Sequence, residues 1–229
     1  MTNKIIPCPE PVNEPIKSYE PGSDERNSLM AELRKLRTTE IEIPLIISGK
    51  EVRTGNFTDC VMPHNHQHIL ARYHKAGKAE VNLAIESAKE AWHDWSRSSL
   101  EERSAIFHTM ADLLAGPYRN LLNAATMLNV SKNVFQAEID SACELIDFYR
   151  FNPWYAQELY SHQPMYSPKP TKNRTEHRPL EGFVFAVTPF NFVSIAGNLP
   201  TSPVLMGNVS LWKPASSAVF PAYYLMKLF

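Results

Sequence analysis

The sequence predicts an α/β protein in which a helical region precedes the start of a doubly wound, Rossmann-like parallel sheet. Apolar residues recur at helical spacing through much of residues 23–150. Two short, continuous apolar runs follow at 183–187 and 209–212, and both are typical of buried strands. The stretch between them, 188–208, is long enough for a crossover helix, and such connections are almost always right-handed and join parallel strands.

The first elements along the chain are short. Residues 1–22 are rich in proline and are expected to be extended. A helix is predicted from Ser23, because apolar residues follow at helical spacing with acids early and bases late, as the helix dipole favours. The β-branched run at 43–47, followed by Ser48-Gly49, predicts a small hairpin that ends at residue 53.

Four more helices are predicted, at about 81–95, 98–116, 118–128 and 133–150. The second of them opens with a capping box within Ser98 to Glu102. The last has an expected apolar side that consists of Phe135, Ile139, Ala142, Ile146 and Tyr149. Its expected solvated side carries Asp140, Glu144 and Asp147.

Proline-rich residues 161–179 lack periodicity and separate two units. We therefore divide the chain into a helical part at 1–160, a linker or arm at 161–179, and a first βαβ unit at 180–229. A second crossover helix is expected to begin at residue 221. Because two strands cannot complete a parallel sheet that is covered on both faces, we expect a truncated domain.

Composition and charge exclude several classes of protein. The formal net charge is −1, so nucleic acid is not an expected partner. No apolar run approaches the roughly 20 residues that span a bilayer, so no membrane association is expected. Three cysteines without a C-x-x-C pair favour a reducing, cytoplasmic setting. The eight glycines fit no G-x-G-x-x-G or Walker spacing, so a nucleotide site must work without a glycine-rich turn.

The ends of the two predicted strands are the expected place for chemistry, because ligands of open α/β sheets bind beyond the carboxyl ends of strands. Asn191 follows the first strand and Lys213 ends the second. An amide donor there could stabilise a developing oxyanion, which is worth roughly 3–4 kcal/mol in measured cases, and the lysine could bind a cofactor ribose or phosphate. Position alone leaves other roles open, since asparagine often caps a turn and strand-end lysines are usually solvated.

Histidines and cysteines are weaker candidates. A strand would point the imidazoles of His64, His66 and His68 to one side, as a transition-metal site would need. Their neighbours are typical of loops, and no carboxylate or thiol completes the set, so no metal site is expected. The cysteines show no base in the adjacent sequence and are predicted to be unreactive: Cys8, Cys60 and Cys143.

Longer motifs extend over nearly the whole chain. They lie at residues 13–15, 22–23, 115–117, 136–140, 144–148, 150–152, 180–192, 196–200, 205–209 and 211–214. These motifs resemble the aldehyde dehydrogenase superfamily, in particular its branch that acts on glutamate gamma-semialdehyde. The resemblance implies the N-terminal portion of an aldehyde dehydrogenase-type doubly wound fold. Residues 1–160 would be the helical part of its cofactor-binding domain, residues 180–229 the first, incomplete βαβ unit of that domain, and the catalytic domain would be absent.

The resemblance also implies a mechanism, in which a cysteine thiolate attacks an aldehyde, hydride passes to NAD and a glutamate-activated water completes the reaction. Asn191 matches the family's oxyanion donor, and Phe192 and Glu144 match residues at the substrate. The residues that match cofactor contacts are Val187, Thr188, Pro189, Phe190, Lys213 and Ser216. The expected reaction is the NAD-dependent oxidation of L-glutamate gamma-semialdehyde to L-glutamate in proline degradation.

The match to the family is incomplete in two respects. The nucleophilic cysteine and the glutamate base match no residue of this chain, so the chain alone is expected to be inactive. Residues 215–217 lack the acid that many NAD-preferring relatives carry, which leaves NADP open.

Other expectations concern partners and location. The resemblance implies a homo-oligomer that uses 161–179 as its oligomerisation arm. Two other functions stay open: a truncated, non-catalytic partner of full-length subunits, and an aldehyde dehydrogenase with another substrate. In a eukaryote, the mitochondrial matrix is the alternative to the cytoplasm.

Overall fold

The structure, a computed structural model, describes residues 8–229. Its elements in chain order are α1 (Asp24–Thr38), β1 (Ile41–Ile43), β2 (Leu45–Ile47), β3 (Lys50–Val52), β4 (Phe57–Met62), β5 (Asn65–His74), α2 (Lys78–Trp95), α3 (Leu100–Ala115), α4 (Arg119–Val130), α5 (Val134–Ala137), the π-helix η1 (Glu138–Glu144), α6 (Leu145–Ser161), β6 (Val184–Val187), α7 (Val193–Leu205), β7 (Ser210–Lys213), the 3-10 turn η2 (Ser216–Ala218) and α8 (Val219–Leu228). Residues 8–22 contain no helix or strand, as predicted, whereas 1–7 lie outside the described residues.

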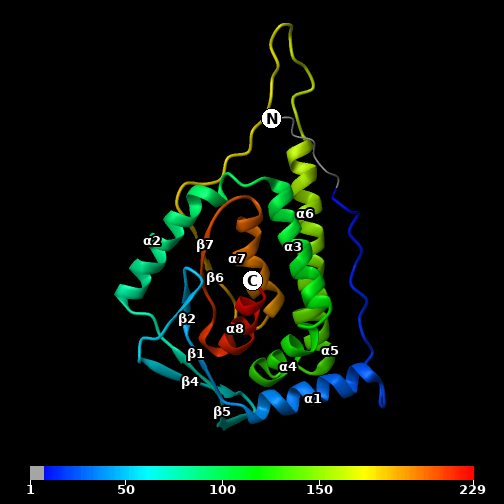
Figure 1. Ribbon diagram of the computed structural model, residues 1–229. Coiled ribbons are helices and arrows are strands. Elements are labelled where there is room, and N and C mark those ends of the chain that lie inside the picture. The colour runs from blue at the N-terminus through cyan, green and yellow to red at the C-terminus, as the bar shows by residue number, and fades with distance from the viewer. Residues whose placement is uncertain (1–7) are drawn as a thin grey trace.

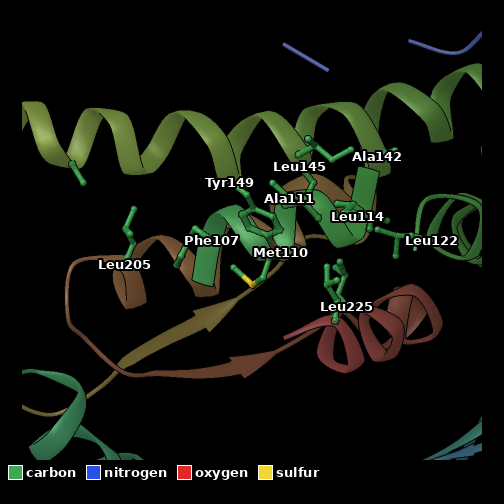
Figure 2. Packing of buried hydrophobic residues seen from close by; sticks show 14 residues of the cluster. Phe107, Met110, Ala111, Leu114, Leu122, Ala142, Leu145, Tyr149, Leu205 and Leu225 are labelled. Atoms are coloured by element: carbon green, nitrogen blue, oxygen red, sulfur yellow. The ribbon is translucent and has the colours of Figure 1, made fainter. Parts of the chain in front are cut away.

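The largest core lies between α3, the long helix α6, α7 and α8 (Figure 1). Figure 2 shows Tyr149 and Leu145 pointing from the long helix toward Phe107 and Leu114 of α3. The rings of Tyr149 and Phe107 meet edge to face at a centroid distance of 5.7 Å, a geometry that aromatic pairs favour. Leu205 of α7 belongs to the same cluster, so the core joins the strand–helix–strand unit to the helical region.

The hairpin predicted at residues 43–53 is confirmed only in part. Antiparallel pairing of β2 with β3 confirms a hairpin, but Ile43 belongs to β1, which pairs in parallel with β5. Pro44 separates the two strands, and proline has no N–H to continue a ladder. The prediction of a loop around His66 is wrong, because β5 begins at Asn65 and pairs with β4. Pairing with neighbouring strands overrides the weak β-propensity of Asn, His and Gln.

The helix predicted at 133–150 contains a π-helical interruption. Ala142, Ile146 and Tyr149 are fully buried, but Phe135 and Ile139 from the same expected apolar side are 55% and 45% exposed. The π-helix η1, which contains Ile139 and Ala142, forms i→i+5 hydrogen bonds and shifts the periodicity on which the prediction rested.

The strands β6 and β7 are parallel, as predicted, and α7 connects them. The apolar run of β6 is typical of a strand that is buried on both faces, but only one face is covered within residues 8–229. Ala186 is 2% exposed, whereas its neighbours Phe185 and Val187 are 61% and 54% exposed. Since successive strand residues point to opposite faces, α7 and the core cover one face of β6, and residues 8–229 leave the other open.

Residues 161–179 form an irregular loop that projects beyond the end of α6 (Figure 1). The side chain of Gln163 joins its two limbs, because its amide donates to the Thr175 carbonyl and its oxygen accepts from the Thr175 N–H at 3.0 Å. At the exposed part of the loop, Met165 is fully exposed and Tyr166 is 75% exposed.

The extended segment before α1 is fixed to the helices by a buried carboxylate. Glu138 is fully buried and accepts hydrogen bonds from the Lys17 N–H at 2.9 Å and from the Tyr19 hydroxyl at 2.7 Å. Arg119 is also buried and pairs with both Glu138 and Glu14. The segment therefore depends on charges that are buried inside the helical region.

Candidate functional site

The ends of β6 and β7 lie at the same edge of the sheet. Val187 and Lys213 are paired residues, and the Thr188 N–H donates to the Lys213 carbonyl at 3.3 Å. The Trp212 indole N–H donates to the Thr188 hydroxyl at 3.0 Å, which fixes the buried Thr188 where the chain leaves β6. The structure therefore brings the two predicted cofactor-binding segments together.

The turn between β6 and α7 carries the predicted oxyanion donor. Asn191 is exposed, and so are Phe190 and Phe192 on either side of it, at 64% and 41%. Directly after this turn, Val193 opens α7 and is 3% exposed. An exposed turn is thus anchored at both ends by buried residues, Thr188 before it and Val193 after it.

The first turn of α7 is bound by a side chain that the sequence prediction placed in solvent. Asp140 is 2% exposed, and its carboxylate accepts hydrogen bonds from the Val193 and Ser194 N–H groups, both at 3.0 Å. The prediction of a solvated acidic side is therefore wrong for Asp140. It is also wrong for Asp147, which accepts hydrogen bonds from the Asn13 side chain and the Glu14 N–H.

Glu144 lies beside the same helix start. Its carboxylate is 2.6 Å from the Ser194 hydroxyl, which is also 2.8 Å from Asp140. Ser194 is fully buried whereas Glu144 is exposed, so the hydroxyl can orient one carboxylate oxygen and leave the other open to solvent. Glu144 therefore lies close to the turn that holds Asn191 and Phe192.

A lysine that the sequence prediction missed completes this group. The Lys132 ammonium lies 2.5 Å from Asp140 and 4.2 Å from the centroid of the Phe192 ring. One sequence signal pointed to such partners. Phe192 has no side-chain acceptor at the N-cap position of α7, so another residue has to bind the free N–H groups.

The residues of the second strand end suit part of a dinucleotide. Lys213 and Ser216 are both exposed, and Ser216 opens the 3-10 turn that leads into α8. In many βαβ units a pyrophosphate binds the amides at the start of the crossover helix. Here Asp140 already occupies those amides, and a phosphate beside that carboxylate would be repelled. A dinucleotide would therefore depend on Lys213 and the η2 turn, in agreement with the missing glycine motif.

The cysteines lie in surroundings that keep the thiols protonated. Burial raises the pKa of Cys60 to about 12. Burial, followed by the Glu138 charge, also raises that of Cys143 to about 12, although the Arg119 guanidinium is 3.4 Å away. Burial raises the pKa of Cys8 as well. Cys8 has no base near it in the sequence, but folding brings His108 Nε2 to 3.1 Å from its sulfur.

Two of the three alternating histidines, His64 and His68, contact different parts of the chain. His64 contacts the Ser131 hydroxyl at 2.8 Å, and His68 contacts the Arg37 carbonyl at 2.8 Å. Within residues 8–229, no group of three or more His, Cys, Asp or Glu side chains is arranged to hold a metal ion. In the same range no helix is both long enough and apolar enough to span a membrane.

Known proteins match this chain over most of its length. The sequence model of the aldehyde dehydrogenase family matches residues 51–229. A delta-1-pyrroline-5-carboxylate dehydrogenase from Agaricus bisporus is 48% identical over 217 residues, which are 94% of this chain and 40% of that protein. The mitochondrial delta-1-pyrroline-5-carboxylate dehydrogenase of Homo sapiens is 44% identical over 216 residues, 94% of this chain and 38% of that protein.

Solved structures agree with the sequence matches. One of them is the crystal structure of the delta-pyrroline-5-carboxylate dehydrogenase from Mycobacterium tuberculosis bound with NAD, which is 46% identical and has a TM-score of 0.96. The match covers 99% of this chain and 42% of the Mycobacterium tuberculosis chain. The chain thus has the N-terminal part of an aldehyde dehydrogenase-type fold, and it spans about 40% of the length of the curated relatives it matches. Since the family's sequence model matches well over half of its residues, the chain belongs to the aldehyde dehydrogenase family.

Proposed function

We propose that this chain supplies the cofactor edge and the oxyanion donor of an NAD-dependent dehydrogenase that oxidises L-glutamate gamma-semialdehyde, the open form of delta-1-pyrroline-5-carboxylate, to L-glutamate. The observation that carries this proposal is the parallel, in-register pairing of β6 and β7, because it sets the Asn191 turn and Lys213 at one edge. The relatives that cover 94% of the chain support the choice of substrate and a place in proline degradation.

The cofactor would lie across the two strand ends. Lys213 and Ser216 donate hydrogen bonds to its ribose or phosphate oxygens, and residues 187–190 line the side toward β6. When bound, the nicotinamide supplies the hydride acceptor. NADP remains the alternative, because residues 215–217 contain no carboxylate that would repel a 2′-phosphate.

The substrate would be held on the α7 side of the same edge. The Asn191 amide donates a hydrogen bond to the carbonyl oxygen as negative charge develops there, in a turn that is already fixed. Phe192 packs against the aliphatic carbons of the substrate. Glu144, oriented by the Ser194 hydroxyl, accepts hydrogen bonds at the polar end.

Cofactor binding tests the proposal directly. We expect NAD to bind the chain in isothermal titration calorimetry, and Lys213→Met to weaken that binding at least about tenfold, since a charge-assisted hydrogen bond is lost. Lys172→Met in the exposed loop is the matched control and should bind like the wild type. An affinity that is the same in both variants, or no binding by the wild type, would contradict the proposal; a parallel titration with NADP establishes the preference.

Turnover by these residues alone is not expected. All three cysteines lie within residues 8–229, and burial raises the pKa of each thiol, so none is a ready nucleophile. With pyrroline-5-carboxylate and NAD, absorbance at 340 nm should stay at the level of the protein-free blank. Steady NADH formation would show that the thiol chemistry is misassigned, and a panel of other aldehydes would then separate substrate preferences.

The projecting loop is proposed as a contact between subunits. Met165 and Tyr166 are large, apolar and exposed, and surfaces of this kind are commonly covered in assemblies. Sedimentation velocity should show a homo-oligomer that Met165→Asp weakens, whereas Glu90→Gln, at an exposed position of α2, leaves it intact. Co-purification with longer subunits that depends on Met165 would favour the alternative of a non-catalytic partner.

The compartment is also a proposal. Three free cysteines fit the reducing cytoplasm. The relatives from Dictyostelium discoideum and Homo sapiens carry the word mitochondrial in their names, which supports the matrix as the alternative. Cell fractionation with a tagged chain distinguishes the two.

A further inference from the structure

The helix that follows the Asn191 turn cannot be capped by its own sequence. Phe192 occupies the N-cap position of α7 and has no polar side-chain atom to accept the first free N–H groups. Those groups are buried, with Val193 3% exposed and Ser194 fully buried, so water cannot satisfy them. A partner from elsewhere in the chain is therefore required.

Asp140 is that partner, although it lies more than fifty residues earlier in the chain. One of its oxygens accepts from the Val193 N–H and the other accepts from the Ser194 N–H, both at 3.0 Å. A negative charge at the start of a helix is also favoured by the helix dipole. Asp140 belongs to the π-helix η1, so η1 is joined directly to the residue that follows Phe192.

Lys132 connects the same carboxylate to the aromatic ring of the turn. Its ammonium lies between Asp140, at 2.5 Å, and the Phe192 ring, at 4.2 Å from the centroid. The lysine side chain is 14% exposed and the Asp140 side chain 3%, so solvent screens this contact only weakly. The orientation of Phe192 is thereby tied to the position of Asp140.

We infer that Asp140 and Lys132 are positioning residues for Asn191 and Phe192. Asp140 sets where the backbone turns into α7, and Lys132 sets the direction of the neighbouring ring. The roles of Asn191 and Phe192 in substrate binding and catalysis rest on the proposed function. The positioning itself is a property of the chain and can be measured without cofactor or substrate.

Amide hydrogen exchange tests the role of Asp140. In Asp140→Ala, the Val193 and Ser194 amides should exchange at least about fivefold faster, as expected for the loss of an N-cap. Ser99→Ala is the matched control, since the Ser99 hydroxyl caps α3 by accepting from the Glu102 N–H. It should speed exchange at the start of α3 and leave α7 unchanged.

Two further measurements separate positioning from general stability. The Lys132 methylene protons next to the ammonium should resonate upfield because of the Phe192 ring current, and Asp140→Ala should move them toward their ordinary shift. Asp140→Asn keeps one acceptor oxygen but no charge. It should restore part of the amide protection, while the Lys132 signal stays near its ordinary shift, as in Asp140→Ala.

The outcomes decide between the explanations. If Asp140→Ala and Ser99→Ala speed exchange alike at α3 and α7, Asp140 contributes only to overall stability and the inference is wrong. Unchanged exchange at Val193 together with an unchanged Lys132 signal would also overturn it. If the exchange and NMR results hold but the wild-type chain binds neither NAD nor NADP, the proposed function fails while the positioning role stands.

Discussion

Glu138→Ala is the substitution that should reveal how strongly the extended N-terminal segment depends on buried charge. The carboxylate is fully buried and accepts hydrogen bonds from the Lys17 N–H, the Tyr19 hydroxyl and the Asn123 amide, besides pairing with Arg119. Its removal leaves those donors without their acceptor and Arg119 with one carboxylate fewer. Breaking a buried pair in this way costs about 3–5 kcal/mol, which is a large part of a typical folding free energy.

Urea denaturation followed by tryptophan fluorescence measures this loss. With a denaturant dependence of about 3 kcal/mol per M for a chain of this size, the midpoint should fall by about 1–1.7 M. Glu90→Gln, an exposed acid on α2, is the control and should leave the midpoint within about 0.2 M. Proteolysis should cut Glu138→Ala first within residues 8–22. A midpoint that matches the control would refute the view that this carboxylate fixes the segment.

The same carboxylate predicts how stability depends on pH. Burial alone would raise the pKa of Glu138, but hydrogen bonds from Arg119, the Lys17 N–H and Tyr19 outweigh it and hold the pKa below the usual 4.5. A carboxyl whose pKa is lower in the folded state stabilises the fold above its unfolded pKa and loses that contribution as the pH falls. The stability difference between wild type and Glu138→Ala should therefore be full at neutral pH and shrink below about pH 4.5, when urea midpoints are compared across pH.

Two other predictions concern packing and thiols. A Cβ on Gly197 would come within 2.9 Å of both Leu145 methyl carbons, so Gly197→Ala should lower stability by about 1–2 kcal/mol in urea melts despite the better helix propensity of alanine. Cys60 and Cys143, with pKa values near 12, should react with a thiol reagent at pH 8 only after unfolding, whereas the half-buried Cys8 should react first. Fast labelling of Cys143 in the folded chain would contradict its placement.

The features that the sequence predicted correctly depend on neighbours in the chain. Ser23 accepts from the Arg26 N–H and opens α1, and the Ser99 capping box opens α3, because both contacts span three residues. The parallel pair β6 and β7 also follows from local order, since the connection between them is one helix. The site residues at the two strand ends were placed at one edge by the same rule.

The features that the prediction missed depend on contacts between distant residues. The β1 strand pairs Ile43 with Tyr73, and nothing in the run 43–47 specifies that partner. Asp140 and Asp147 look like solvated acids because the periodicity places them away from an apolar side. Their partners, the start of α7 and the residues at 13–14, are brought to them only by folding.

Two acids of η1 are close in sequence and both buried because each faces a different segment of the chain. Glu138 and Asp140 are two residues apart, so they leave the helix on roughly opposite sides. One side meets Lys17 and Tyr19, and the other meets the start of α7, so η1 is covered by two different segments of the chain. Each acid accepts from N–H groups of a segment that is distant in the chain, and replacing either by an apolar side chain would leave those donors without this acceptor. The polar composition of this helix therefore reflects its place between the N-terminal segment and the candidate site, rather than exposure to solvent.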